Sequence, residues 1–351
     1  MPSDISSNRI GKLDALRGAA ALMVFLAHCP PGFMENVWWL QPLRDGYGAV
    51  LIFFLLSGHV LALQLEGRQP PGYAGFLTRR VFRIWPAYAV VLVLTFAGLY
   101  WTQTPVKGGM PGAVARVPGW QDLVENGLFL GDPDAINSPA WSLYVEMRLS
   151  VVFPLLLLGT RRLGLMGSLV AGTVFSVAAT RLVHVPLPGF LLSLAEASRY
   201  VVLFMAGAVL ARPQNAVEQL YHKLPFSARA AALAAAVAMI GCKFHPLLVG
   251  IPYVNYVGWV GYGVLFVFCL YSGRVGRLLH CRPLLFLGHV SYGLYLLHTP
   301  LILLLESHLP PGWRPLVVLA ASVLGGWLLL RWVEEPCMAL GRRLSKARRV
   351  G

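Results

Sequence analysis

The stretch GYGAVLIFFLLSGHVLALQL, residues 46–65, runs for twenty residues without an aspartate, glutamate, lysine or arginine. An α-helix rises about 1.5 Å per residue, so this stretch is long enough to cross the roughly 30 Å hydrocarbon core of a bilayer. It lacks the alternation of apolar and polar residues that transmembrane strands show. The stretch therefore predicts a membrane-spanning helix.

Similar apolar stretches lie on both sides of it, and little chain remains for a soluble domain. Asp14 and Arg17 interrupt the first stretch and no cleavage site follows, so we expect a span there rather than a secretory signal. The fold class is an all-α integral membrane protein, a bundle of about ten transmembrane helices. The predicted spans are 13–30, 46–65, 84–102, 139–159, 164–181, 199–211, 229–246, 252–271, 284–305 and 315–333.

Composition supports this class. Hydrophobic residues make up 57% of the 351 residues, and charged residues only 13%, about half the roughly 25% usual in soluble domains. These values exclude a disordered protein, a secreted disulfide scaffold and an ordinary soluble enzyme. The five cysteines lack metal-ligand spacing and are expected to be mostly small core residues, so no metal site is predicted.

The net charge of +14 is distributed unevenly along the chain. With the N-terminus in the cytoplasm, nineteen of the 29 lysines and arginines fall in predicted inner segments and seven in outer loops. This bias predicts both termini inside. The chain then divides into a cytoplasmic N-terminus (1–12), a transmembrane domain (13–333) and a basic cytoplasmic tail (334–351). The basic residues are scattered over six short segments, which disfavours a nucleic-acid partner and favours contact with the lipid bilayer.

Ionisable residues inside spans are costly, so each is a candidate for function. Arg17 and His28 in the first span are eleven residues apart, which places them on one helix face, about 16 Å apart along the axis. Asp14 lies one turn before Arg17 and is a candidate for binding substrate or lining a pore. The alternative interpretation is that Arg17 snorkels to the inner surface and His28 is an interfacial imidazole.

A second group, Arg79, Arg80 and Arg83, stands at the inner end of the third span. Arg80 and Arg83 share a helix face, and paired guanidinium groups can hold phosphate groups bidentately. The alternative is ordinary anchoring of a cytoplasmic segment by positive charge.

Two further groups of polar residues lie deeper in the chain. Glu146 stands near the outer end of the fourth span, where a carboxyl can orient an imidazole or act as an acid or base, or pair with another helix. In the ninth span Ser291, Tyr295 and His298 can form a polar stripe lining a cavity, with Tyr292 beside it. Ordinary hydrogen bonding between helices explains such a stripe equally well.

Taken together, these motifs resemble those of the acyltransferase family 3 membrane proteins, which O-acylate bacterial glycans and some small molecules. The resemblance covers residues 8–338. Many members carry an extra hydrolase-like domain at the C-terminus, whereas this chain ends shortly after its last predicted span, so we expect a stand-alone form. The matching stretches are Leu13–Gly18 with His28 (Arg-x10-His), Arg80–Arg83 (Arg-x-x-Arg), Trp141–Glu146 and Ser291–His298.

The resemblance implies transfer of an acyl group, most often acetyl, from cytoplasmic acetyl-CoA to an outward-facing glycan at the bacterial inner membrane. Acyl-CoA is then a donor substrate, and no cofactor is bound permanently. Arg80 and Arg83, with Arg79, would hold the CoA head, and Arg17 would lie further along the path of the donor. Capsule, O-antigen, exopolysaccharide, a lipid-linked intermediate and a secondary metabolite all fit as acceptors.

In this mechanism His28 takes the proton of the acceptor hydroxyl, and Glu146 orients its imidazole. Direct transfer and a transient acyl-histidine are both open. Trp141 can stack on a sugar ring, although tryptophans are common at membrane interfaces. Ser142, which follows it in the same motif, is a candidate for binding substrate or lining a pore.

Two other functions use the same residues. A transporter or flippase of a polar lipid-linked sugar would need buried charges, but the second half of the chain does not repeat either arginine motif, which disfavours it. A non-catalytic receptor explains the spans but not the four motifs together.

Overall fold

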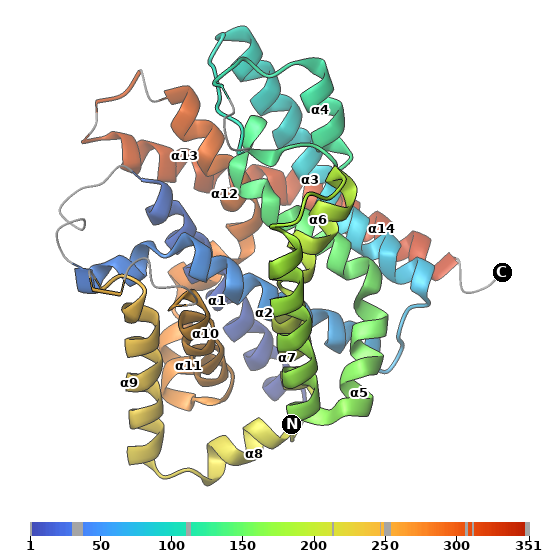
Figure 1. Ribbon diagram of the computed structural model, residues 1–351, viewed down its shortest axis with the longest axis vertical. Helices are drawn as coiled ribbons and strands as arrows, with labels where there is room; N and C mark the ends of the chain where they lie inside the picture. The colour runs from blue at the N-terminus through green and yellow to red at the C-terminus, as the bar shows by residue number, and fades with distance from the viewer. Residues whose placement is uncertain are drawn as a thin grey trace. The chain divides into compact units, whose positions relative to one another are not determined.

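The protein is described here from a computed structural model that defines residues 2–29, 38–109, 114–212, 214–245, 247–248, 254–305, 308–310 and 312–347. Within these ranges the regular structure is helical, and the one extended pairing is an isolated antiparallel bridge between Val106 and Arg116. The helices belong to two compact units, each assembled from separate stretches of the chain (Figure 1). The all-α class is thereby confirmed.

Unit 1 comprises Met1–Leu63, Leu157–Gly172 and Val202–Ser291. Helices α9 and α10 lie side by side in it (Figure 1). Its elements are α1 (Pro2–His28), η2 (Trp38–Arg44), most of α2 (Gly46–Glu66), α7 (Val201–Ala211), α8 (Ala216–Lys223), α9 (Phe226–Cys242), α10 (Val254–Tyr271) and α11 (Gly273–Leu279), with parts of α5 and α12.

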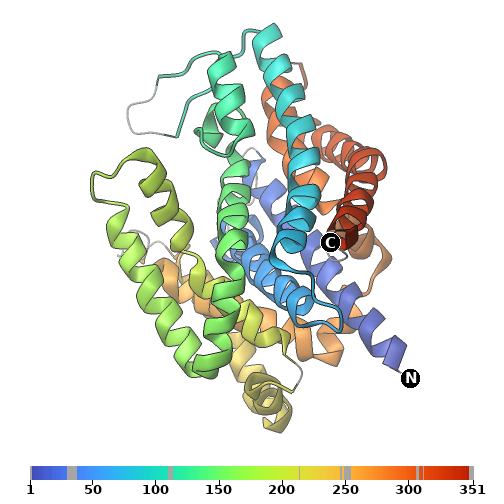
Figure 2. The same ribbon diagram turned by 90° about the vertical axis from the view of Figure 1, so that its right-hand side faces the viewer.

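Unit 2 comprises Gln64–Leu156, Thr173–Val201 and Tyr292–Gly351. The last helix, α14, lies along the first half of α3 (Figures 1 and 2). The elements of unit 2 are α3 (Tyr73–Trp101), α4 (Trp120–Gly127), η3 (Pro133–Ala135), η4 (Ser138–Ala140), α6 (Gly189–Ser198), α13 (Arg314–Leu329), the π-helix η5 (Leu330–Glu334) and α14 (Glu335–Ala347), with the remaining parts of α5 (Trp141–Leu182) and α12 (Arg282–Leu305).

Seven helical segments of the described chain are long and apolar enough to cross a membrane, or eight if α8 and α9, bent by 119°, form one span. These segments overlap eight or nine of the ten predicted spans, because one of them, Ser138–Leu182, contains two. Helix α1 differs because Lys12, Asp14 and Arg17 give its apolar part three charges. A total of ten spans, and both termini in the cytoplasm, therefore stay predictions.

The fourth and fifth predicted spans lie in α5, whose helical geometry is broken at Gly164. There φ is +64° and ψ is −166°, a conformation that glycine adopts at little cost because it lacks a Cβ. The break falls at the end of the predicted connection between the two spans. All five cysteines are free thiols.

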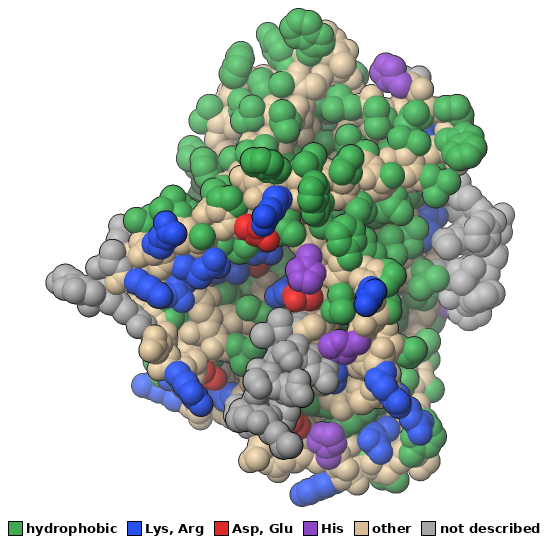
Figure 3. All heavy atoms as spheres, turned by 180° about the vertical axis from the view of Figure 1, so that it is seen from behind, with side chains coloured by type: hydrophobic (Ala, Val, Ile, Leu, Met, Phe, Trp, Pro, Cys, Tyr) green, Lys and Arg blue, Asp and Glu red, His purple; other side chains and the backbone are tan. Residues whose placement is uncertain are grey.

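Unit 2 has a well-packed core in which α3, α5 and α12 meet. Tyr88, Phe96 and Leu143 are almost fully buried in it, together with Leu296 from α12. Large apolar side chains on other faces stay exposed, as expected of helices that face lipid. Figure 3 shows many such apolar side chains on the surface, with fewer lysines and arginines among them.

Helix α1 packs against the start of α12 through two glycines of unit 1. A Cβ placed on Gly288 would lie 2.0 Å from the backbone oxygen of Asp14, and one placed on Gly18 would lie 2.6 Å from the backbone nitrogen of Gly288. Small residues allow helix backbones to approach this closely in membranes. The contact holds the helix that carries the Arg-x10-His motif.

Replacing Gly288 by alanine is expected to destabilise unit 1 by about 1–3 kcal/mol, because the methyl group overlaps backbone that cannot move aside easily. The thermal midpoint of the detergent-solubilised protein measures this. Gly263→Ala in α10 is the control, since a Cβ there meets nothing within 4 Å. Equal midpoints for Gly288→Ala and the parent would show that the two helices are not packed in this way.

Candidate functional site

The residues of the first motif lie in unit 1 along α1. Nη1 of Arg17 donates to Oδ1 of Asp14 at 2.5 Å, and both side chains are partly exposed. The pair is spaced i,i+3, so it forms across one helical turn. Asp14 is therefore the ion-pair partner of Arg17, and its role in substrate binding or in lining a pore stays a prediction.

His28 is the last residue of α1, and its side chain is exposed. Its Nδ1 lies 2.9 Å from the carbonyl oxygen of Val24. Because a carbonyl can only accept, Nδ1 carries the proton of the neutral ring and Nε2 carries the lone pair. The backbone of α1 thus selects the tautomer in which Nε2 can act as a base.

A guanidinium group that the sequence did not single out secures the end of α1. Arg44 donates from Nε to the Leu26 carbonyl at 3.0 Å and from Nη2 to the Cys29 carbonyl at 2.7 Å. The last carbonyl groups of a helix have no hydrogen-bond partner within it. The two bonds from Arg44 supply such partners at the turn that carries His28.

The next residue, Asp45, is buried and holds this region to α10. Its Oδ1 accepts from the backbone nitrogen of Gly48 at 2.8 Å, and its Oδ2 accepts from the hydroxyl of Tyr262 at 2.6 Å and pairs with Lys243. An aspartate directly before an apolar helix is an N-cap signal, which could have drawn attention to it.

The second motif lies in unit 2, on the first half of α3. Arg80 is almost buried, and its Nη2 donates to Oε1 of Glu146 at 2.5 Å while its Nε donates to Ser150 at 3.2 Å. Glu146 therefore forms the ion pair with another helix that was the structural alternative for it. His28 belongs to the other unit, so these contacts do not test the predicted orienting role of Glu146.

The neighbouring arginines are more accessible. Arg83 pairs with Glu334 and keeps 35% of its side chain exposed, with its guanidinium 5.4 Å from the ring centre of Tyr292. Arg79 donates to the hydroxyl of Ser345 in α14 at 2.9 Å. The three predicted phosphate-binding arginines thus share one stretch of helix but differ in what they contact.

Glu334 was not predicted as a site residue. Its side chain is fully buried at the end of the π-helix η5. The last span predicted from the sequence, 315–333, ends directly before it. A π-helix contains one more residue in its turn than an α-helix and often occurs at functional sites. The sequence signal that could have found Glu334 is a carboxylate at the end of an apolar stretch.

The polar residues of α12 form hydrogen bonds either to other segments of the chain or to the backbone of α12 itself. The hydroxyl of Tyr295 lies 2.8 Å from both the Ser142 hydroxyl and the Pro139 carbonyl, and Tyr292 donates to the Ile84 carbonyl at 2.7 Å. Ser291 and His298 bond to carbonyls of α12 itself. These contacts favour the structural interpretation of the stripe, hydrogen bonding between and within helices.

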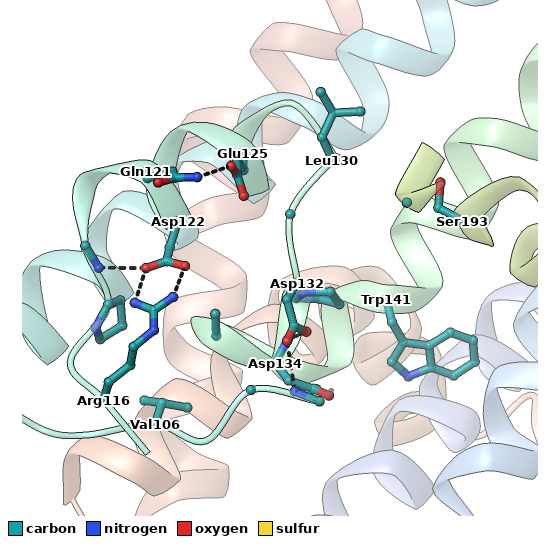
Figure 4. Close-up of a pocket in the computed structure, with 18 of the residues that line it drawn as sticks. Val106, Arg116, Gln121, Asp122, Glu125, Leu130, Asp132, Asp134, Trp141 and Ser193 are labelled. Atoms are coloured by element: carbon teal, nitrogen blue, oxygen red, sulfur yellow. Dashed lines mark hydrogen bonds and ion pairs between the residues drawn. The ribbon is translucent and has the colours of Figure 1, made fainter. Parts of the chain in front are cut away.

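Trp141, the first residue of α5, borders a cavity of about 1030 Å³ in unit 2. Figure 4 shows its ring on one side of the cavity and the Arg116–Asp122 pair on the other, with Asp132 and Asp134 between them. The walls come from the described parts of the segment 106–135, namely 106–109 and 114–135 with α4, and from α6. The segment connects the third and fourth predicted spans, on the outer side if the N-terminus is cytoplasmic as predicted.

The loop is organised around Asp122. Its two carboxylate oxygens accept from Nη1 and Nη2 of Arg116, each at 2.6 Å, and Oδ2 also accepts from the backbone nitrogen of Gly119 at 2.7 Å (Figure 4). The hydrogen bond from Arg116 lowers the pKa of Asp122 below its usual value. By contrast, burial raises the pKa of Asp134.

Acidification is therefore expected to loosen this wall of the cavity. Because the folded-state pKa of Asp122 is lowered, its stabilising contribution is complete above about pH 4, the pKa of an unfolded aspartate, and is lost as the pH falls through the folded value. Limited proteolysis of the loop as a function of pH measures the change. Asp122→Asn should remove the acid transition; an identical profile in both proteins would contradict the assignment.

A smaller cavity of about 240 Å³ shares Trp141, Ser193 and Glu196 with the first. It continues along α5 to Tyr144, Val145 and Arg148. The two cavities thus follow the helix stretch that also carries Glu146.

The apolar helices and their buried ionisable side chains define a polytopic membrane protein whose charged groups are candidates for function. The profile of a family described as an acyltransferase domain matches residues 10–331, and the chain belongs to this family of acyltransferases. The predicted family resemblance is confirmed.

Three relatives are similar to the chain. The peptidoglycan O-acetyltransferase OatA of Listeria monocytogenes is 24% identical over 94% of this chain and 56% of its own length. BcsY of Komagataeibacter xylinus, described as a membrane-bound transacylase, is 29% identical over 84% of this chain and 73% of its own. The acyltransferase MdmB of Streptomyces mycarofaciens is 32% identical over 42% and 39%. The chain spans just over half the length of OatA, and no solved structure gives a significant match.

Proposed function

We propose that the protein is an O-acetyltransferase of the bacterial inner membrane that moves an acetyl group from cytoplasmic acetyl-CoA to a hydroxyl of an outward-facing glycan. Family membership and relatives named as peptidoglycan O-acetyltransferases support the reaction class. A transporter or flippase is not favoured, because the family and these relatives are acyltransferases.

The observation that carries the proposal is the exposed His28 ring, whose Nδ1 is held by the Val24 carbonyl. Its Nε2 takes the proton of the acceptor hydroxyl as that oxygen attacks the thioester carbonyl carbon. The carbon–sulfur bond then breaks, and the imidazolium returns the proton to the departing thiolate. Arg44 supports this step indirectly, since it holds the last turn of α1.

The donor is proposed to bind through its phosphate groups to the motif arginines. Arg79 and Arg83 have partly exposed side chains and are proposed to contact a phosphate, whereas Arg80 is buried and bonded to Glu146 and Ser150. Arg17 would contact the donor further along its path. What the contacts support for Glu146 is holding Arg80 in place; that it also orients His28 stays a proposal.

Membrane vesicles supplied with acetyl-labelled acetyl-CoA and the cell's own glycans test the function. Label should enter the glycan fraction only when the protein is present, and mild base should release it, as expected of an ester. Glycan mass spectrometry of a deletion strain and its parent should show the loss of acetyl groups, and fragmentation should identify the sugar. Identical glycans in the two strains, with no labelled glycan in the vesicles, would refute the proposal.

A further inference from the structure

The cavity of about 1030 Å³ beside Trp141 has a lining whose charge is opposite to that of the whole chain. We infer that it binds sugar units of the acceptor that are neutral or carry an amino group, and that it excludes anionic sugars such as uronic acids. The inference rests on the proposed function, since it specifies the acceptor of that reaction. It assigns a glycan-binding role to the stretches 106–109 and 114–135, which include α4, and to α6.

The size and walls of the cavity fit a carbohydrate. Ligand sites commonly have volumes of about 300–1,000 Å³, so this chamber can hold more than one sugar ring. Trp141 borders it and also contacts the ring of Tyr200, with centroids 5.7 Å apart, which limits the freedom of the indole. Trp120 lines the chamber too and is 66% exposed. The apolar face of a sugar can pack on such rings.

Carboxylates supply the polar part of the same walls. Of the fifteen acidic residues in the chain, five line this cavity, and Arg116 is the one lysine or arginine among the lining residues that the structure describes. Arg116 is neutralised by Asp122, with which it forms two hydrogen bonds. The excess negative charge belongs to Glu125, Asp132, Asp134 and Glu196.

Two of these carboxylates, Glu125 and Asp132, have hydrogen-bond contacts that leave their negative charge uncompensated. Glu125 accepts from the amide of Gln121 at 2.7 Å, and Asp132 accepts from the backbone nitrogens of Gly109 and Asp134 at 2.9 and 3.0 Å. These donors are neutral. Carboxylates are strong acceptors for sugar hydroxyls and for ammonium groups, whereas a second carboxylate in the chamber is repelled.

The smaller cavity has a different charge. Arg148 and Arg199 line it beside Glu196, and Arg148 donates to the Phe129 carbonyl at 2.8 Å and lies over the Tyr144 ring. The smaller cavity, lined by two arginines and one glutamate, thus lacks the excess of negative charge of the larger cavity. An acceptor glycan would meet the carboxylates there and reach α5 through the smaller cavity.

Equilibrium binding of labelled tetrasaccharides to the full chain in nanodiscs of zwitterionic lipid tests the inference without any acyl donor. Chitotetraose is the neutral probe, its de-N-acetylated form the cationic probe and tetragalacturonate the anionic probe. We expect the first two to bind and the third to bind at least about tenfold more weakly at low salt. High salt should narrow this difference by screening.

Two sets of variants locate the effect. Glu125→Gln combined with Glu196→Gln should raise the affinity for tetragalacturonate several-fold relative to that for chitotetraose and should weaken binding of the cationic probe, whereas Glu335→Gln, outside the cavity, should leave the ratio of the three affinities as in the parent. Trp141→Ala should weaken chitotetraose binding roughly two- to tenfold, and Trp332→Ala, outside the cavity, should not.

Equal affinity for the anionic and neutral probes, or no effect of Trp141→Ala on either, would overturn the inference. The result is separable from the proposed function because no acetyl transfer is measured. Selective binding with no transfer from any donor would refute the proposed function and leave the cavity assigned. Transfer to a glycan with no selective binding would overturn the cavity assignment alone.

Discussion

His28→Ala is expected to slow acetyl transfer by about 10²–10⁴-fold, the usual contribution of a general base. The variant removes Nε2, the ring nitrogen that carries the lone pair when Nδ1 donates to Val24. The end of α1 should stay in place, because Arg44 bonds to backbone carbonyls that the substitution does not change. Initial rates in membrane vesicles, normalised to the amount of inserted protein, measure the effect.

His289 provides a matched control. It is also exposed, lies on α12, and its Nδ1 contacts the carbonyl four residues earlier, Leu285, at 2.7 Å. His289→Ala should keep full activity. A loss of activity in both variants would indicate a general effect of removing a histidine from a helix and not the loss of a base. Full activity in His28→Ala with normal insertion would exclude His28 as the base. Recovery of labelled His28 peptide from the parent would favour an acyl-histidine over direct transfer.

Glu334→Ala is expected to destabilise unit 2 by about 3 kcal/mol, the lower end of the range for removing one partner of a buried ion pair. The carboxylate is fully buried, whereas 35% of the Arg83 side chain is exposed and can recover some hydration. Thermal unfolding in detergent measures the loss. Glu335→Ala is the control, because its pair with Arg331 is exposed and such pairs contribute about 0–1 kcal/mol.

A double variant separates the structural role of this pair from donor binding. Arg83→Met combined with Glu334→Leu removes both charges and should recover much of the stability lost in Glu334→Ala. Its affinity for acetyl-CoA should nevertheless fall, since Arg83 is proposed to contact a phosphate. Unchanged donor affinity in a stable double variant would leave Arg83 with a structural role alone.

The sequence predicted the helices better than the relations between them. Residues 46–65 needed only their length and lack of charge to predict α2, and the break in α5 falls within one residue of its predicted place. Helix α14 was missed because its charges made it resemble a tail, although it packs on α3 through Gly341 and Ser345. Arg348 and Arg349 of that tail lie outside the described residues.

The candidate site was predictable residue by residue but not pair by pair. The cost of burying a charge singled out Glu146, and the pairing with Arg83 singled out Arg80. The ion pair between Arg80 and Glu146 nevertheless joins residues 66 positions apart, which no helical spacing encodes. Arg83 and Glu334 are 251 positions apart. The cavity beside Trp141 was equally hidden, because its carboxylates come from a long loop and from α6 and gather only once the chain folds.

The π-helix η5 has a consequence for every residue that follows it. One extra residue in the turn advances the phase of the rest of the helix by about 100°. The extra residue in η5 therefore sets which face of α14 meets α3, namely the face that carries Gly341 and Ser345. The residues of α14 alone do not set it. Deleting a single residue within Leu330–Glu334 would turn that face away and withdraw Ser345 from Arg79 without altering either side chain. The number of residues in this segment thus determines which face of the last helix packs on α3.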